Sequence, residues 1–166
     1  HLAAIAQTGE EIIGEVNIDN LAAPPKSIFL YPQVQATPEA VCALRRAEVI
    51  LLGPGSFLTS IIPPILLTEV GEILRNSDSK KIFIDNLATE HGPAASLSLP
   101  DRIRWIENIV GKPVIDGAIV PLKLAGKYRL PNVKIIANRL NADDISYRHD
   151  RTLLCKAIDE LIGELA

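Results

Sequence analysis

Four short apolar runs alternate along the chain with segments that have the spacing of amphipathic helices. The runs are "EVILLG" (48–53), "KKIFIDN" (80–86), "VIDGAIV" (114–120) and "NVKIIA" (132–137). The first is apolar at consecutive positions, as expected of a strand in a parallel sheet that helices cover on both faces. Helical spacing follows at 63–75, 99–110 and 150–165. This alternation predicts a doubly wound α/β fold with a mostly parallel sheet.

Capping signals and period-2 patterns predict further elements. A threonine followed by proline and glutamate is typical of a helix N-terminus, so we expect a helix over 37–46. The helix over 99–110 should end at Gly111. Nearer the N-terminus, 11–19 predicts a strand broken at Gly14, and 27–31 predicts a short strand.

Composition predicts one globular α/β domain over residues 1–166. Hydrophobic residues make up 48%, charged residues 22%, and the net charge is −3. No basic stripe favours nucleic acid, no apolar run approaches the roughly 18 residues of a membrane span, and no signal peptide is visible. Two distant cysteines, Cys42 and Cys155, indicate a reducing cytoplasm rather than a disulfide framework. Because the chain begins at His1 and contains no methionine, we expect a portion of a longer domain.

The stretch after the first apolar run carries the strongest functional signal. Gly53-Pro54-Gly55-Ser56 fits a type II turn, in which Gly55 would take the positive φ. The hydroxyls of Ser56, Thr59 and Ser60 follow near an expected helix start, where free N–H groups favour an anion. A tight turn with capping hydroxyls is the alternative; their density favours an anion or nucleotide site. The stretch is neither a P-loop nor G-x-G-x-x-G.

Two other stretches follow expected strands or precede a helix. Asp85-Asn86 could hydrogen-bond a sugar hydroxyl, although a turn or cap is the more common role. Glu90 and His91 in the next loop could face the same cleft. In "YRHDR" (147–151), Arg148 suits a phosphate and Asp150 suits a helix cap, and the pattern does not separate a ligand site from a cap.

Metal and hydrolase sites find little support in the sequence. Its three histidines, His1, His91 and His149, lack ligand spacing. Ser56, His149 and Asp150 do not form a catalytic triad by adjacency alone. No cofactor is evident.

Five stretches together resemble the gluconeogenesis factor (YvcK-like) family, which is related to 2-phospho-L-lactate transferase (CofD-like). They are "GEVNID" (14–19), "ATPEAV" (36–41), "ILLGPGSFLTSIIPPILL" (50–67), "VIDGAIV" (114–120) and "YRHDR" (147–151). The resemblance implies a Rossmann-like three-layer α/β/α fold. The Gly-rich start and the Asp-Asn-Gly-Gly-Ser-type loop of the family are not present, so this chain resembles the C-terminal part of a member.

The resemblance also implies a ligand. Family members bind UDP-sugars such as UDP-N-acetylglucosamine and are associated with gluconeogenic growth and cell shape. Carried over by residue, the nucleotide cleft would include Gly53, Pro54, Gly55, Ser56, Thr59, Ser60, Asn86 and Arg148. The family has a Gln-Pro-Gly-Glu-like loop after the asparagine, where this chain reads "LATEHGPAAS" (87–96).

Three functions remain open at this point. The first is a regulatory protein that binds a nucleotide or nucleotide-sugar. The second is a transferase that acts on a nucleotide-linked donor, the only case in which Mg²⁺ would be expected. The third is an α/β domain whose turns only cap helices. The oligomeric state is also open, a homo-oligomer included.

Overall fold

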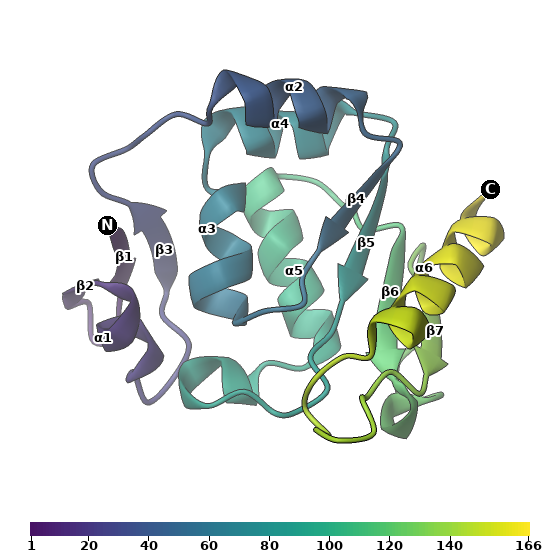
Figure 1. Ribbon diagram of the computed structural model, residues 1–166. Coiled ribbons are helices and arrows are strands. Elements are labelled where there is room, and N and C mark those ends of the chain that lie inside the picture. The colour runs from purple at the N-terminus through teal and green to yellow at the C-terminus, as the bar shows by residue number, and fades with distance from the viewer.

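A four-stranded parallel sheet forms the centre of the protein in the computed structural model, which describes residues 1–166 (Figure 1). Its strands lie in the order β4-β5-β6-β7. Their bounds are Val49–Leu52, Lys80–Ile84, Gly117–Pro121 and Lys134–Asn138. The predicted parallel α/β sheet is therefore confirmed, with β6 beginning three residues later than its apolar pattern.

Helices cover this sheet on both faces. On one face, helices α3 (Ile62–Ile65), α4 (Thr68–Asn76) and α5 (Leu99–Val110) pack around Phe83 in the larger apolar core. On the other, α6 (Arg151–Leu165) packs on Ile82 and Ile84 in a smaller core. Side chains that alternate between faces along β5 thus join two cores. The three layers match the fold that the family resemblance implies.

A second, antiparallel sheet precedes the parallel one. Its order is β2-β1-β3, with bounds Glu11–Ile13, Leu2–Ile5 and Ser27–Leu30. The strand predicted over 11–19 is wrong in its second half: β2 ends before Gly14, which has φ +97°, and Glu15–Asp19 is the short helix α1. Ile18 of α1 is fully buried in the larger core, so packing of this residue outweighs its β propensity.

Local signals predicted the longer helices well and one helix badly. Helix α2 (Pro38–Arg46) begins after Thr37, whose hydroxyl accepts from the N–H of Ala40, and α5 ends at Gly111 in the left-handed conformation. The single helix expected over 63–75 is wrong. A π-helix, η1 (Phe57–Ile61), continues directly into α3. Helix α4 then starts in a new direction, at 79° to the segment that η1 and α3 form together.

Strand β4 lies at an edge of the parallel sheet, with one side unpaired. Its pattern predicted burial on both faces, but Leu51 is 43% exposed while Ile50 and Leu52 lie in the larger core. The prediction fails at Leu51 because α6 packs mainly on β6 and β7, and on β4 only Val49 joins the smaller core.

No helix alone has the length and apolar character to cross a membrane; η1–α3 and α4 would meet that test only as a bent pair.

Candidate functional site

The carboxyl ends of β4 and β5 bring together two of the three predicted stretches. Gly53–Ser56 follows β4, and Asp85-Asn86 follows β5. The side-chain Nδ2 of Asn86 donates to the backbone oxygen of Gly55 at 2.8 Å. A turn and a strand end 31 residues apart therefore share one edge of the sheet, as parallel neighbours require.

The turn itself differs from the prediction. Gly53, not Gly55, has the positive φ, at +97°, and the Gly53–Pro54 peptide is cis, so the type II assignment is wrong. A Cβ on Gly53 would lie 2.7 Å from the backbone oxygen of Ile84, whereas one on Gly55 would meet Ser60 and Ile61 at ordinary distances of 3.5 and 3.9 Å. Gly53 is thus the position where β4 and β5 approach too closely for a side chain.

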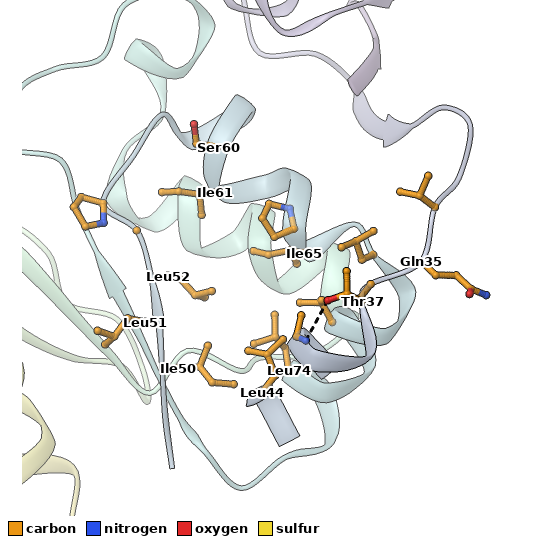
Figure 2. A pocket seen from close by; sticks show the side chains of 18 residues that line it. Gln35, Thr37, Leu44, Ile50, Leu51, Leu52, Ser60, Ile61, Ile65 and Leu74 are labelled. Carbon is orange, nitrogen blue, oxygen red and sulfur yellow. Dashed lines mark hydrogen bonds between the residues drawn. The ribbon is translucent and has the colours of Figure 1, made fainter. Parts of the chain in front are cut away.

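The hydroxyls after the turn do not converge on one point. Ser56 and Thr59 hydrogen-bond each other at 2.8 Å, and Thr59 also donates to the carboxylate of Asp19 on α1 at 3.3 Å. Ser60 is exposed and lies at the rim of an apolar pocket (Figure 2). The first N–H of η1, on Phe57, donates to a carboxylate oxygen of Glu90 at 2.8 Å. A protein carboxylate thus occupies the place predicted for an external anion.

A buried group of charges lies beneath this turn. Arg102 on α5 contacts Asp85 at 2.6 Å and Glu90 at 3.2 Å, and its side chain is only 8% exposed. Its guanidinium lies 5.8 Å from the ring centre of Phe57. Burial raises the pKa of Asp85, and the charge of Arg102 acts in the opposite direction. Asp85 therefore serves as the partner of a buried cation, and the sugar-binding role considered for it has no support here.

The third predicted stretch reaches the same edge through His149 and not through Arg148. Burial lowers the pKa of His149, and the nearby backbone carbonyl of Asp85 acts the other way. Arg148 is more than half exposed and pairs with Asp144 at 2.6 Å. It lines a separate cavity of about 390 Å³ with His149 and Arg151, which includes none of the turn residues. Asp150 caps α6 as predicted.

Two polar cavities lie along the carboxyl ends of β5, β6 and β7. The first, of about 280 Å³, includes Asn86 and Arg102 together with Lys123 and Lys127. The second, of about 670 Å³, lies toward β7 and shares Ala88, Thr89 and Lys123 with the first. The two cavities adjoin at these residues, and together they are called the cleft below.

An apolar groove lies on the other side of β4 (Figure 2). Ile50 and Leu52 of β4 face Ile61 and Ile65 across it, with helices α2 and α4 at its far end (Figure 2). Its volume is about 550 Å³. Most of its lining is hydrophobic, and among the predicted site residues it contains Gly53, Pro54 and Ser60. The groove has the character of a face for packing rather than for binding a charged ligand.

Sequence reasoning missed the cations of the cleft. Arg102 lies in the helix expected over 99–110, and Lys123 and Lys127 lie between two expected strands, but none of them was assigned a role from the sequence. The rule that singled out the ends of β4 and β5 applies equally to the end of β6 and would have found the two lysines. The position of Arg102 depends on the packing of α5, which no local pattern indicates.

The fold and the cleft define a class: a Rossmann-like α/β protein with a polar cleft at the carboxyl edge of its parallel sheet. Within that class, the chain belongs to the family of 2-phospho-L-lactate transferase CofD, whose model matches residues 1–161. It is 62% identical over 165 residues to a protein of Pasteurella multocida named "Putative gluconeogenesis factor", covering 99% of this chain and 54% of that protein. It is 30% identical over 139 residues to "Gluconeogenesis factor" of Bacillus subtilis, covering 80% of this chain and 44% of that protein.

A solved structure has the same fold. A UPF0052-family protein of Bacillus halodurans superposes with a TM-score of 0.83 at 24% identity, covering 95% of this chain and 57% of that one. The chain thus spans about half the length of the relatives it matches. It corresponds to their C-terminal part, as the missing family motifs implied.

Proposed function

We propose that this chain forms one wall of a UDP-sugar site in a cytoplasmic regulatory protein that links carbon metabolism to cell shape. The observation that carries the proposal is the hydrogen bond from Asn86 to Gly55. It joins two of the stretches that resemble the family's nucleotide cleft, at the sheet edge where open α/β sheets bind ligands. The polar cleft beside it offers room for a sugar and its phosphates.

Calorimetric titration with UDP-N-acetylglucosamine tests this proposal. It uses a protein of the relatives' full length that carries these residues, because this chain spans only about half of that length. Arg148→Ala should weaken binding about tenfold, as expected when a charged contact to the nucleotide-sugar is lost. Arg104→Ala is the matched control, since Arg104 is also an exposed arginine in an ion pair but lines neither the cleft nor the cavity of Arg148. Absence of binding, or equal affinity in both variants, contradicts the proposed role of Arg148.

The family model favours a second candidate, a transferase of the 2-phospho-L-lactate type. Such an enzyme would move a phospholactate group from a guanosine-linked donor to a deazaflavin precursor, and Mg²⁺ would be the cofactor to include. Incubating the full-length protein with both substrates and Mg²⁺ should then give the transferred product. If no product forms while the protein still binds a UDP-sugar, the result supports the regulatory function over the transferase.

A further inference from the structure

The smaller polar cavity of the cleft carries an excess of positive charge. Asp85 and Arg102 line it as an ion pair, and Lys123 and Lys127 line it without a carboxylate partner of their own. When Glu90, which also pairs with Arg102, is counted with these four side chains, one positive charge remains unbalanced. A polar cavity of this charge, at the ends of two parallel strands, suits an anionic group.

The two lysines are exposed, but the ammonium group of each has a contact that holds it in place. The Nζ of Lys123 donates to the backbone oxygen of Leu87 at 2.7 Å, which fixes it over the end of β5. The Nζ of Lys127 lies 5.2 Å from the ring centre of Tyr128, whose face favours a cation. Each ammonium has three N–H donors, so both retain donors for a ligand.

Arg102 is the buried cation in the wall of this cavity. Its side chain is 92% buried, since 8% is exposed, and its Nε is a buried donor without a protein acceptor. Buried donors are seldom left without an acceptor in folded proteins. Hydroxyls of Thr89 and Tyr128 also line the wall. The cavity therefore presents charged and neutral donors to whatever occupies it.

We infer that this cavity binds a phosphate group, and that Lys123 and Lys127 are its principal charged contacts. The volume of about 280 Å³ takes part of a ligand rather than all of it. Lys123 also lines the neighbouring cavity of about 670 Å³, so the rest of a ligand can extend toward β7. The inference rests on the proposed function, because it names where the diphosphate of a UDP-sugar would bind.

The test measures the affinity of the full-length protein for inorganic pyrophosphate, UDP-N-acetylglucosamine and uridine by calorimetry. Lys127→Gln should weaken binding of both phosphate-bearing probes about tenfold and leave uridine binding unchanged. Lys127→Arg, which keeps the charge, and Lys156→Gln, an exposed lysine on α6 outside the cavity, should bind both within about twofold of the parent. Lys123→Gln should repeat the loss, and Lys127 is the cleaner site because it holds no backbone hydrogen bond.

The outcomes separate this inference from the proposed function. If pyrophosphate binding depends on Lys127 but the protein does not bind the UDP-sugar, the phosphate cavity is supported and the UDP-sugar is rejected as the ligand. UDP-sugar binding that is indifferent to both lysines rejects the phosphate cavity and keeps the proposed function. Failure to bind either phosphate-bearing probe rejects both. Because Lys127 is exposed, its variants should fold normally, which a thermal melt checks.

Discussion

Arg102 shows how strongly one side chain can depend on its partners. It is buried between Asp85 and Glu90, and each of these would be left as an uncompensated buried charge without it. The neighbouring Arg104 has a similar contact with Asp101, but in solvent. Two arginines on one helix therefore offer a direct comparison of a buried and an exposed ion pair.

Replacing Arg102 by Met should lower the free energy of unfolding by about 3–5 kcal/mol, because it strands two buried carboxylates. Arg104→Ala should change it by less than about 1 kcal/mol. Urea unfolding at neutral pH measures both. Adding Asp85→Leu to the first variant should recover part of the loss, since one stranded charge is then removed. A loss below about 1 kcal/mol for Arg102→Met would contradict this account of the cluster.

His149 should make stability depend on pH. Burial lowers its pKa in the folded protein, so the unfolded chain binds more protons between the two pKa values. The contribution of His149 to the free energy of unfolding is therefore complete above about pH 6.5, the pKa of the unfolded chain. It is lost as the pH falls through the folded-state pKa. Urea unfolding from about pH 7.5 to about pH 5 should show a weaker pH dependence in His149→Gln than in the parent. His91→Gln, at an exposed site, is the control, and equal slopes in all three proteins would contradict the prediction.

Among elements, the turn after β4 gives the clearest contrast between neighbouring positions. Gly53→Ala should cost roughly 2 kcal/mol or more, because the residue has φ +97° and its Cβ would collide with the backbone of Ile84. Gly55→Ala should stay within about 0.5 kcal/mol, since its Cβ finds ordinary space. Thermal and urea unfolding compare the two. A larger loss of stability for Gly55→Ala than for Gly53→Ala would contradict this account and favour the type II turn predicted from the sequence.

Elements with their own capping signals could be predicted from sequence, and elements set by tertiary packing could not. Thr37, Gly111 and Asp150 each mark a helix end by a local hydrogen bond or backbone conformation. Helix α1 instead forms where Ile18 is buried. The break between α3 and α4 carries no glycine and no side-chain cap that would indicate it in the sequence. The site follows the same division. Its turn and Asn86 follow strands visible in the pattern, whereas Arg102 and Glu90 meet only through the packing of α5 and a loop.

At the scale of the whole molecule, the face of β4 that carries Leu51 is exposed, although the sequence pattern predicted that it would be buried. In the 166-residue chain, Leu51→Lys should change the free energy of unfolding by less than about 0.5 kcal/mol, because Leu51 is 43% exposed. In a full-length relative that carries the same strand, the same change should cost about 2 kcal/mol or more, since we expect the preceding half to cover this leucine. Leu122→Lys, 57% exposed beyond β6, is the control in both backgrounds. Equal effects of Leu51→Lys in the two backgrounds would show that the additional half does not cover β4.

The order β4-β5-β6-β7 has one more consequence. Strands that follow one another in a single direction contain no reversal, and open α/β sheets form their ligand crevice where the order reverses. A preceding half that added its strands to the free side of β4 would create that reversal beside Gly53–Ser56. A ligand in the crevice would then touch both halves and act as a crosslink between them. Ligand binding would then strengthen the association of the two halves, and association of the halves would strengthen ligand binding. The same coupling free energy would describe both effects.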